Sequence, residues 1–242
     1  MTQHKKRTTS QGAGDFNDGA KRKKYQFTPR SNEQKELFNT ILERDLTFAV
    51  GPAGTGKTHV MAAAIEHAYR NGIRKIYLCR PAVDAGEDLG YFKGDVDEKI
   101  APYFRPLFDE LDEVFGKEKR KQMMEDGEIE LASFATMRGR TLKNAIVVLD
   151  EAQNTTIAQM KLFLTRIGSK AKVIISGDLK QNDLKTADNG LSDAIQRFSK
   201  YAEVGIVKLT KVVRSRIASM AVEAYGDENL STRLPKAAAN NR

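Results

Sequence analysis

Cysteine, histidine and long apolar runs are scarce in this sequence of 242 residues. Its one cysteine, Cys79, cannot form an intramolecular disulfide, and a cysteine-rich metal site is excluded. No stretch approaches the roughly 20 apolar residues that a membrane span needs. The charged N-terminus is not followed by the apolar run of a secretory signal. We therefore expect a cytoplasmic protein in reducing surroundings, with no membrane partner.

The charge of the chain is distributed unevenly, although apolar residues make up 40% of it, enough for one full α/β domain. Residues 1–30 hold eight basic and two acidic side chains, whereas the other 212 residues hold 32 basic and 30 acidic ones. A basic tail suggests an acidic partner such as nucleic acid, but a solvated leader fits the charge equally well. Residues 1–27 lack apolar periodicity, so we predict a disordered basic tail there and a second tail over 226–242.

Between the tails, over residues 28–225, short apolar runs alternate with helical patterns. The predicted strands are Leu46–Val50, Ile73–Cys79, Glu128–Leu131, Ala145–Asp150, Ala171–Ser176 and Val204–Leu209. The predicted helices are Asn32–Glu43, Lys57–Asn71, Asp97–Phe115, Lys117–Asp126, Thr156–Ile167, Leu191–Ser199 and Ser215–Tyr225. Such alternation is typical of an α/β protein whose mostly parallel sheet is covered by helices on both faces. The stretch Tyr91–Leu131 departs most from it and suggests a helical insertion packed on one edge.

A glycine-rich loop lies between the first predicted strand and the helix that follows it. Its residues are Gly51, Pro52, Ala53, Gly54, Thr55, Gly56, Lys57 and Thr58, which match the pattern G-x-x-x-x-G-K-[ST]. Glycines let the backbone wrap phosphates, and the helix N-terminus adds a partial positive charge. We expect Lys57 to reach the β- and γ-phosphates of ATP and the Thr58 hydroxyl to bind Mg²⁺.

Two carboxylates follow the most apolar predicted strand, as Asp150 and Glu151. Ligands of open α/β sheets bind at this carboxyl end of the strands. We expect Asp150 to hold Mg²⁺ through water and Glu151 to polarise the water that attacks the γ-phosphate. An ordinary acidic turn is the alternative, but the glycine-rich loop makes the catalytic interpretation the stronger one.

A third strand ends in Gly177-Asp178, with Gln181 three residues later. In P-loop motors, a glutamine at such a place contacts the γ-phosphate or the attacking water, and couples the nucleotide state to a partner site. A plain turn at the end of a strand would have the same spacing.

These motifs occur in an order that resembles the PhoH-like family of phosphate-starvation-inducible ATPases. The likeness covers about residues 31–217 and is carried by the segments 51–58, 80–90, 137–142, 150–156, 161–168 and 177–178. It implies a RecA-like P-loop domain related to superfamily 1 helicases, with ATP hydrolysis linked to RNA or another single-stranded nucleic acid. The chain departs from the family pattern at Lys211 and Ser215, on either side of Val212-Val213-Arg214, and at Lys185.

The resemblance also assigns roles to residues outside the phosphate loop. Gln34 is similar to the glutamine that reads adenine, with an exposed helix residue as the alternative. Arg80 begins a loop that helicases use to contact nucleic acid or to pass on the nucleotide state. Arg138 and Arg140 bracket a turn from which they would reach phosphates of ATP or RNA. Arg214 resembles a late arginine that senses the γ-phosphate.

The length of the chain bears on assembly, because superfamily 1 helicases place ATP between two RecA-like domains and this chain has room for one. We therefore expect a homo-oligomer, such as a hexameric ring, in which a neighbouring copy supplies the missing wall. Two other functions remain open: an ATP-gated nucleic-acid-binding or scaffold protein with little turnover, and a small-molecule kinase. Glu151 argues against the first, and the Gly177–Gln181 segment argues against the second.

Overall fold

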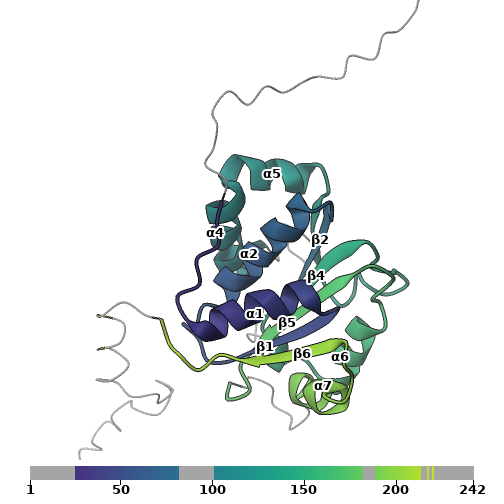
Figure 1. Cartoon of the computed structure of the whole chain (residues 1–242). Helices are drawn as coiled ribbons and strands as arrows, with labels where there is room; N and C mark the ends of the chain where they lie inside the picture. Colours follow the sequence, from purple (N-terminus) through teal and green to yellow (C-terminus); the bar gives the residue numbers. More distant parts are fainter. Residues whose placement is uncertain (1–24, 82–100, 182–188, 214–216, 218–219, 221–242) are drawn as a thin grey trace, which may run out of the picture.

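A six-stranded sheet forms the centre of the computed structural model, which describes residues 25–81, 101–181, 189–213, 217 and 220 (Figure 1). The strands are β1 (Leu46–Val50), β2 (Lys75–Cys79), β3 (Ile129–Ala132), β4 (Ala145–Leu149), β5 (Lys172–Gly177) and β6 (Val204–Lys208). They lie in the order β3-β2-β4-β5-β1-β6, and every pairing between them is parallel. The predicted α/β class with a parallel sheet is confirmed.

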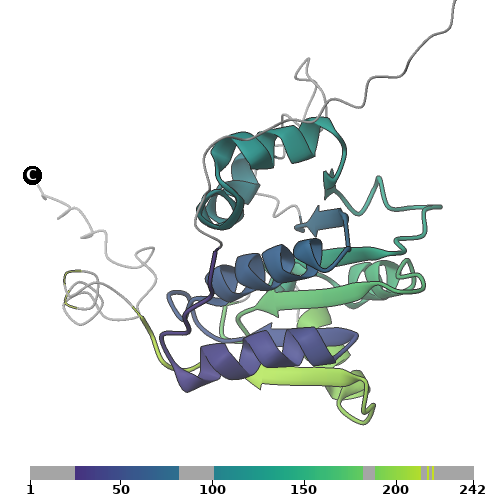
Figure 2. The same cartoon turned by 45° about the horizontal axis from the view of Figure 1, so that its top comes forward.

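Helices cover both faces of this sheet (Figure 2). One face carries α1 (Asn32–Glu43), α2 (Lys57–Arg70), α4 (Arg105–Phe115) and α5 (Lys117–Glu125); the other carries α6 (Ile157–Leu164) and α7 (Gly190–Phe198). Two short 3₁₀ helices are η1 (Ala101–Phe104) and η2 (Ala152–Asn154). Strand β4 is buried throughout and alternates between the two layers, since Ile146 and Val148 pack on the α2 side while Val147 and Leu149 pack on the α6 side. The fold is that of a RecA-like P-loop domain.

Two predicted helices are shorter in the structure. Of the helix expected over Asp97–Phe115, residues 97–100 lie outside the described residues, Ala101–Phe104 form the 3₁₀ helix η1, and Arg105–Phe115 are α-helical. Pro106 stands in the first turn of α4, where a missing N–H costs nothing. The helix expected to reach Ile167 ends at Leu164, because Ile167 instead forms a bridge with Leu142. The helix predicted over Ser215–Tyr225 lies outside the described residues, apart from 217 and 220.

The strand order decides which sequence motifs meet. Strands β4, β5 and β1 are adjacent, and all carboxyl ends of a parallel sheet lie at one edge. The glycine-rich loop after β1, the acidic pair after β4 and Gly177-Asp178 at the end of β5 are therefore brought together. Strand β2 lies beside β4, which places Arg80 at the same edge. Among the described residues, no helix is long and apolar enough to cross a membrane.

Candidate nucleotide site

The glycine-rich loop joins the end of β1 to the start of α2. Gly56 has a φ of +82°, a left-handed conformation that favours glycine, and no side chain caps the helix that follows it. The first N–H groups of α2 can therefore face phosphate oxygens. Lys57 begins the helix, and its Nζ donates to the carbonyls of Gly51 and Pro52, at 2.5 and 3.0 Å. A phosphate that binds here would replace those carbonyls as the partner of the lysine.

The segment after β6, residues 209–213, is hydrogen-bonded to the end of β1 and to this loop. The N–H of Leu209 donates to Val50 at 2.7 Å, and the N–H of Val213 donates to Gly54 at 2.7 Å. A Cβ at Gly51 would lie 2.1 Å from the carbonyl oxygen of Leu209. The first glycine of the motif thus makes room for the protein's own backbone, which the sequence alone does not reveal.

Two neighbouring residues of α1, Glu33 and Gln34, also hold these segments by hydrogen bonds. The Glu33 carboxylate accepts the N–H groups of Thr210 and Lys211, at 2.8 and 2.9 Å, and hydrogen bonds from these two residues lower the pKa of Glu33. Gln34 is only 1% exposed and donates from Nε2 to the Thr55 carbonyl at 3.0 Å. The alternative of an exposed helix residue is therefore wrong for Gln34, whereas its contact with adenine stays a prediction.

Asp150 follows β4 and is 9% exposed. Burial and the adjacent charge of Glu151 raise its pKa, while Arg80 opposes them. The Ser176 hydroxyl is buried in the same pocket, beside the Asp150 carboxylate, and its interaction with that carboxylate acts to lower the pKa of Asp150. A buried carboxylate with a hydroxyl beside it fits a hydrated cation, and oxygen atoms are the ligands that Mg²⁺ prefers. No cluster of three or more His, Cys, Asp or Glu side chains occurs in the described ranges, so Mg²⁺ would depend on Thr58, Asp150, phosphates and water.

Both oxygens of the Glu151 carboxylate have partners. Glu151 lies at the turn between β4 and η2, and its φ of 53° is uncommon for residues other than glycine. Its Oε1 lies 3.3 Å from Nη2 of Arg80, and its Oε2 accepts Nε2–H of Gln153 at 2.6 Å. Gln153 is 1% exposed, and its Oε1 accepts the N–H of Asp178 at 3.1 Å. One buried glutamine thus connects the carboxyl ends of β4 and β5.

One pocket of about 250 Å³ is lined by eight of the predicted residues: Ala53, Gly54, Gly56, Lys57, Thr58, Asp150, Glu151 and Gln181. Burial lowers the pKa of Lys57, and the carboxylates of Asp150, Asp178 and Glu151 act in the opposite direction. Glu110 also lines the pocket, which therefore brings one desolvated lysine together with four carboxylates. This combination fits the prediction of a ligand that carries both phosphate charge and a divalent cation.

The three predicted arginines that the structure describes, Arg80, Arg138 and Arg140, do not line this pocket. Arg80 is at its rim, on Glu151. Arg140 forms an ion pair with Glu130 and is not directed at the phosphate loop. Arg138 is exposed and has no hydrogen bond or ion pair with any described residue. Arg214 lies outside the described residues.

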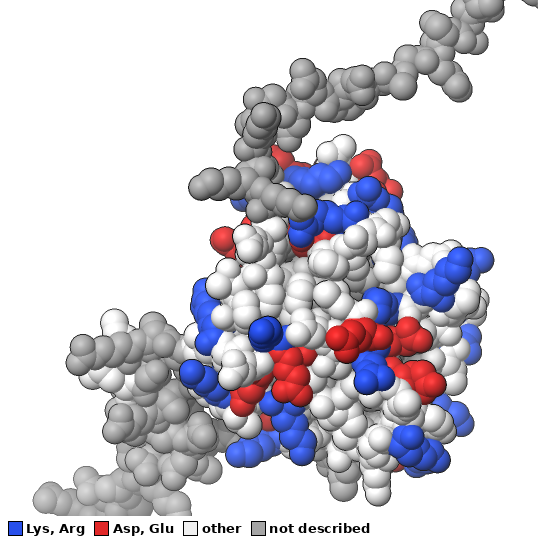
Figure 3. Space-filling view, viewed as in Figure 1, with Lys and Arg blue, Asp and Glu red and all other residues white. Residues whose placement is uncertain are grey.

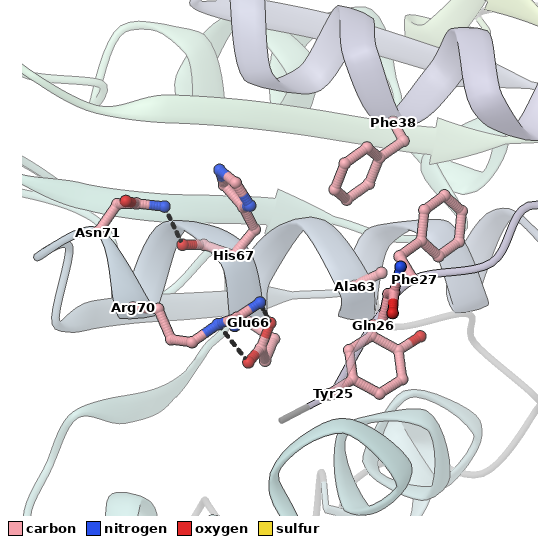
Figure 4. Close-up of a pocket in the computed structure, with 9 residues that line it drawn as sticks. All are labelled: Tyr25, Gln26, Phe27, Phe38, Ala63, Glu66, His67, Arg70 and Asn71. Atoms are coloured by element: carbon pink, nitrogen blue, oxygen red, sulfur yellow. Dashed lines mark hydrogen bonds and ion pairs between the residues drawn. The ribbon is translucent and has the colours of Figure 1, made fainter. Parts of the chain in front are cut away.

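A larger cavity, of about 750 Å³, lies along the far half of α2, beside Phe38 of α1 and the segment 25–27 (Figure 4). Phe27 and Phe38 stack there with ring centroids 4.6 Å apart, and Glu66 forms an ion pair with Arg70 at 2.6 Å. No residue of the segment 51–58 lines it. The residues predicted to bind the nucleotide converge in the smaller pocket instead.

Sequence reasoning missed two residues of the site, Glu33 and Gln153. Gln153 stands two positions after Glu151, and its place in the acidic motif was the available signal. Glu33 gave no signal, because its partners Thr210 and Lys211 are 177 and 178 residues away.

Comparison with protein families gives a match to the model described as "PhoH-like protein" over residues 26–226. A PhoH-like protein of Bacillus subtilis is 48% identical over 200 residues, 81% of this chain and 63% of that protein. Protein PhoH of Escherichia coli is 45% identical over 202 residues, 81% of this chain and 57% of that protein. The chain thus spans about three fifths of the length of these relatives.

Among solved structures, the Pif1 helicase of Candida albicans is similar to this chain, with a TM-score of 0.46 and 13% sequence identity. That match covers 81% of this chain and 43% of the helicase.

Proposed function

Because the chain belongs to the PhoH-like protein family, we propose that it is a P-loop ATPase that hydrolyses Mg-ATP and couples hydrolysis to single-stranded nucleic acid, with RNA as the first candidate. The observation that supports the proposal most is the pocket that collects Lys57, Thr58, Asp150, Glu151 and Gln181. The ATPase domain would cover residues 28–225, with tails at 1–27 and 226–242, in a cytoplasmic protein.

Each residue of the pocket has a task in this proposal. Lys57 leaves the loop carbonyls and binds the β- and γ-phosphates, whose oxygens also face the N-terminus of α2. Thr58 and Asp150 hold Mg²⁺, which would neutralise charge on the phosphates when bound. Glu151 orients the attacking water and takes its proton. The backbone N–H of Gln181 donates to the Asp178 carbonyl at 3.3 Å. The side chain of Gln181 would contact the γ-phosphate or the attacking water.

Two substitutions separate binding from hydrolysis. Lys57→Ala removes the cation that faces the phosphates, so the affinity for a fluorescent ATP analogue should fall strongly. Glu151→Gln keeps the shape of the side chain and removes the proton acceptor, so binding should persist while turnover is lost. Lys161→Ala, an exposed lysine on α6, is the matched control and should behave as wild type. Wild-type turnover by Glu151→Gln would contradict the assignment of Glu151.

Turnover also separates this proposal from its main rival, an ATP-gated nucleic-acid-binding or scaffold protein. A protein that only switches between states needs no water-activating carboxylate, yet Glu151 lies in the pocket with Lys57 and Asp150. The rival predicts tight ATP binding with negligible phosphate release, with or without nucleic acid.

The basic tail supports contact with nucleic acid. Figure 3 shows one face of the molecule, and there basic and acidic side chains are interspersed, whereas residues 1–30 hold eight basic and two acidic side chains. Tyr25 and Phe27 of the predicted tail pack against the core, which corrects the prediction of disorder up to residue 27, so the test deletes residues 1–24. This deletion should leave the basal ATPase rate intact and weaken binding to single-stranded RNA. The slope of log affinity against log salt should fall by up to about one unit for each phosphate contact removed. If the full-length and the shortened protein have equal RNA affinity and equal salt slope, the tail does not contact RNA and is a solvated leader.

We further propose that the protein works as a homo-oligomer, with a hexameric ring as the first candidate. Three large apolar side chains, Ile157, Leu179 and Val212, are at least 36% exposed and lie in the segments that come after β4, β5 and β6. A neighbouring copy would cover them and complete the site.

Arg138 is the arginine best placed to act across that contact, since Arg140 is already paired with Glu130. Arginines supplied in trans accelerate GTPases by about 10³–10⁵. Mixing inactive Glu151→Gln with inactive Arg138→Ala should restore activity, because some interfaces then hold both intact residues. Arg140→Ala is the control and should retain activity by itself. A fully active monomer in sedimentation would contradict the assembly.

A further inference from the structure

We propose that Arg80 and Tyr103 form a contact site for single-stranded nucleic acid, and that a phosphate bound by Arg80 releases Glu151 for catalysis. The inference rests on the proposed role of Glu151 as the water-activating carboxylate. Arg80 is then a positioning residue, which acts on hydrolysis only through Glu151.

The pairing of β2 with β4 places Arg80 beside the acidic pair. Cys79 is the register partner of Leu149, and the N–H of Asp150 donates to the Cys79 carbonyl at 2.9 Å. The residue after each strand therefore leaves the sheet at the same level. From there Nη2 of Arg80 reaches Oε1 of Glu151 at 3.3 Å.

This ion pair occupies the one oxygen of Glu151 that can be freed. Gln153 holds Oε2 and is itself buried and bonded to Asp178. The side chain of Arg80 is 22% exposed and that of Glu151 is 36% exposed, at a separation of 3.3 Å. A partly solvated pair at this distance is weak. While it persists, a cation lies against Oε1 and competes with a water molecule for it.

The second terminal nitrogen of the Arg80 guanidinium is bonded on the side of Tyr103. Its Nη1 donates to the carbonyl of Tyr103 in η1, outside the nucleotide pocket. Tyr103 is 49% exposed, a large value for an aromatic residue. A guanidinium bonded to the backbone of a residue with an exposed aromatic ring suits single strands, since arginine donates two parallel hydrogen bonds to a phosphate and the ring can stack on a base.

Competition between a phosphate and Glu151 for the same guanidinium then couples the two sites. A bidentate arginine–phosphate contact is stronger than the single long contact to Glu151. When Arg80 moves to the strand, Oε1 becomes free to accept the proton of the attacking water. Hydrolysis therefore accelerates only where nucleic acid is bound.

The test compares Arg80→Ala, Arg80→Lys and Tyr103→Ala in the full-length chain. Arg80→Ala should raise the basal ATPase rate about two- to fivefold, the range for loss of a weak ion pair. Its stimulation by single-stranded RNA should fall towards one, with the KM for ATP unchanged. Arg80→Lys keeps a charge and should retain stimulation, at a higher RNA concentration.

Tyr103→Ala tests the stacking contact separately from the ion pair. Alanine keeps the backbone carbonyl that Arg80 bonds to, so the Arg80–Glu151 contact should stay intact. Its basal rate should equal the wild-type rate, while the RNA concentration for half-maximal stimulation rises. A basal rate below wild type in Arg80→Ala, with an unchanged stimulation ratio, would overturn the proposal.

Binding of labelled single-stranded RNA, followed by fluorescence anisotropy, tests the site independently of turnover. Arg80→Ala and Tyr103→Ala should both bind more weakly, and the salt slope should fall by about one unit in Arg80→Ala. Unchanged affinity in both variants refutes the contact site even in an active enzyme. Weakened affinity in a protein without any turnover would keep the contact site and refute the proposed ATPase.

Discussion

Replacing Gly51 by alanine probes the contact between the phosphate loop and the segment after β6. The new methyl carbon would lie 2.1 Å from the carbonyl oxygen of Leu209 and 3.0 Å from its carbonyl carbon. Since Cβ atoms essentially never approach closer than 3.0 Å, the oxygen must retreat by about 0.9 Å. No left-handed φ is involved at this position, so the cost is steric alone.

The segment has little freedom to retreat. The N–H of Leu209 is bonded to Val50 at 2.7 Å, and that of Val213 is bonded to Gly54 at 2.7 Å. Overpacking of this kind costs about 1–3 kcal/mol, and a lost backbone hydrogen bond adds about 0.5–1.5 kcal/mol. We expect the free energy of unfolding to fall by about 2–4 kcal/mol, a drop in Tm of about 5–15 °C. ATP affinity should fall too, because the loop is displaced.

Thermal unfolding of Gly51→Ala and Gly139→Ala checks this reasoning. Gly139 has a φ of 76° and no atom within 4 Å of an added Cβ, so its substitution costs only backbone strain, about 1–2 kcal/mol. Gly51→Ala should therefore lose more stability than the control. A Tm equal to wild type, or a smaller loss than in Gly139→Ala, would refute the steric argument.

Three further predictions concern other parts of the chain. Gln34→Leu leaves the buried Thr55 carbonyl unpaired and should lower the free energy of unfolding in urea by about 1–3 kcal/mol; an unchanged urea midpoint would contradict this. Burial would raise the pKa of Glu130, but hydrogen bonds from Arg140 and Lys75 outweigh it and lower that pKa. Glu130→Gln should therefore destabilise the protein by about 1 kcal/mol at pH 7, and its difference from wild type should vanish in acid unfolding as the pH falls through the lowered pKa. Cys79 is 1% exposed and burial raises the pKa of its thiol, so a thiol reagent should label it only at the rate of unfolding, and rapid labelling of the native protein would place it at the surface.

Local patterns in the sequence were sufficient for the elements around the site. The helix over Asn32–Glu43 and the strand over Leu46–Val50 have the predicted bounds. Both depend on nearby residues: Ser31 caps the helix by accepting the N–H of Gln34, and a run of five apolar or small side chains is buried in the centre of the sheet. Because a strand is predicted before the glycine-rich loop and a helix after it, the sequence also predicted that the loop joins β1 to α2.

Contacts between distant segments could not be predicted. Arg80 and Glu151 are separated by 71 residues, and only the neighbouring positions of β2 and β4 bring them together. Arg140 was expected to reach phosphates, yet its ion-pair partner is Glu130, ten residues earlier. Charge and spacing show that an arginine needs a partner, but the sheet decides which carboxylate lies within reach.

Phosphate release from stoichiometric Mg-ATP in a single turnover tests the central claim most directly. Wild-type protein and Glu151→Gln would be loaded with ATP in parallel, each with and without single-stranded RNA. The account predicts release by the wild type, faster with RNA, and retained but unhydrolysed ATP on Glu151→Gln. Equal release by the two proteins, or none by the wild type with RNA present, would contradict it.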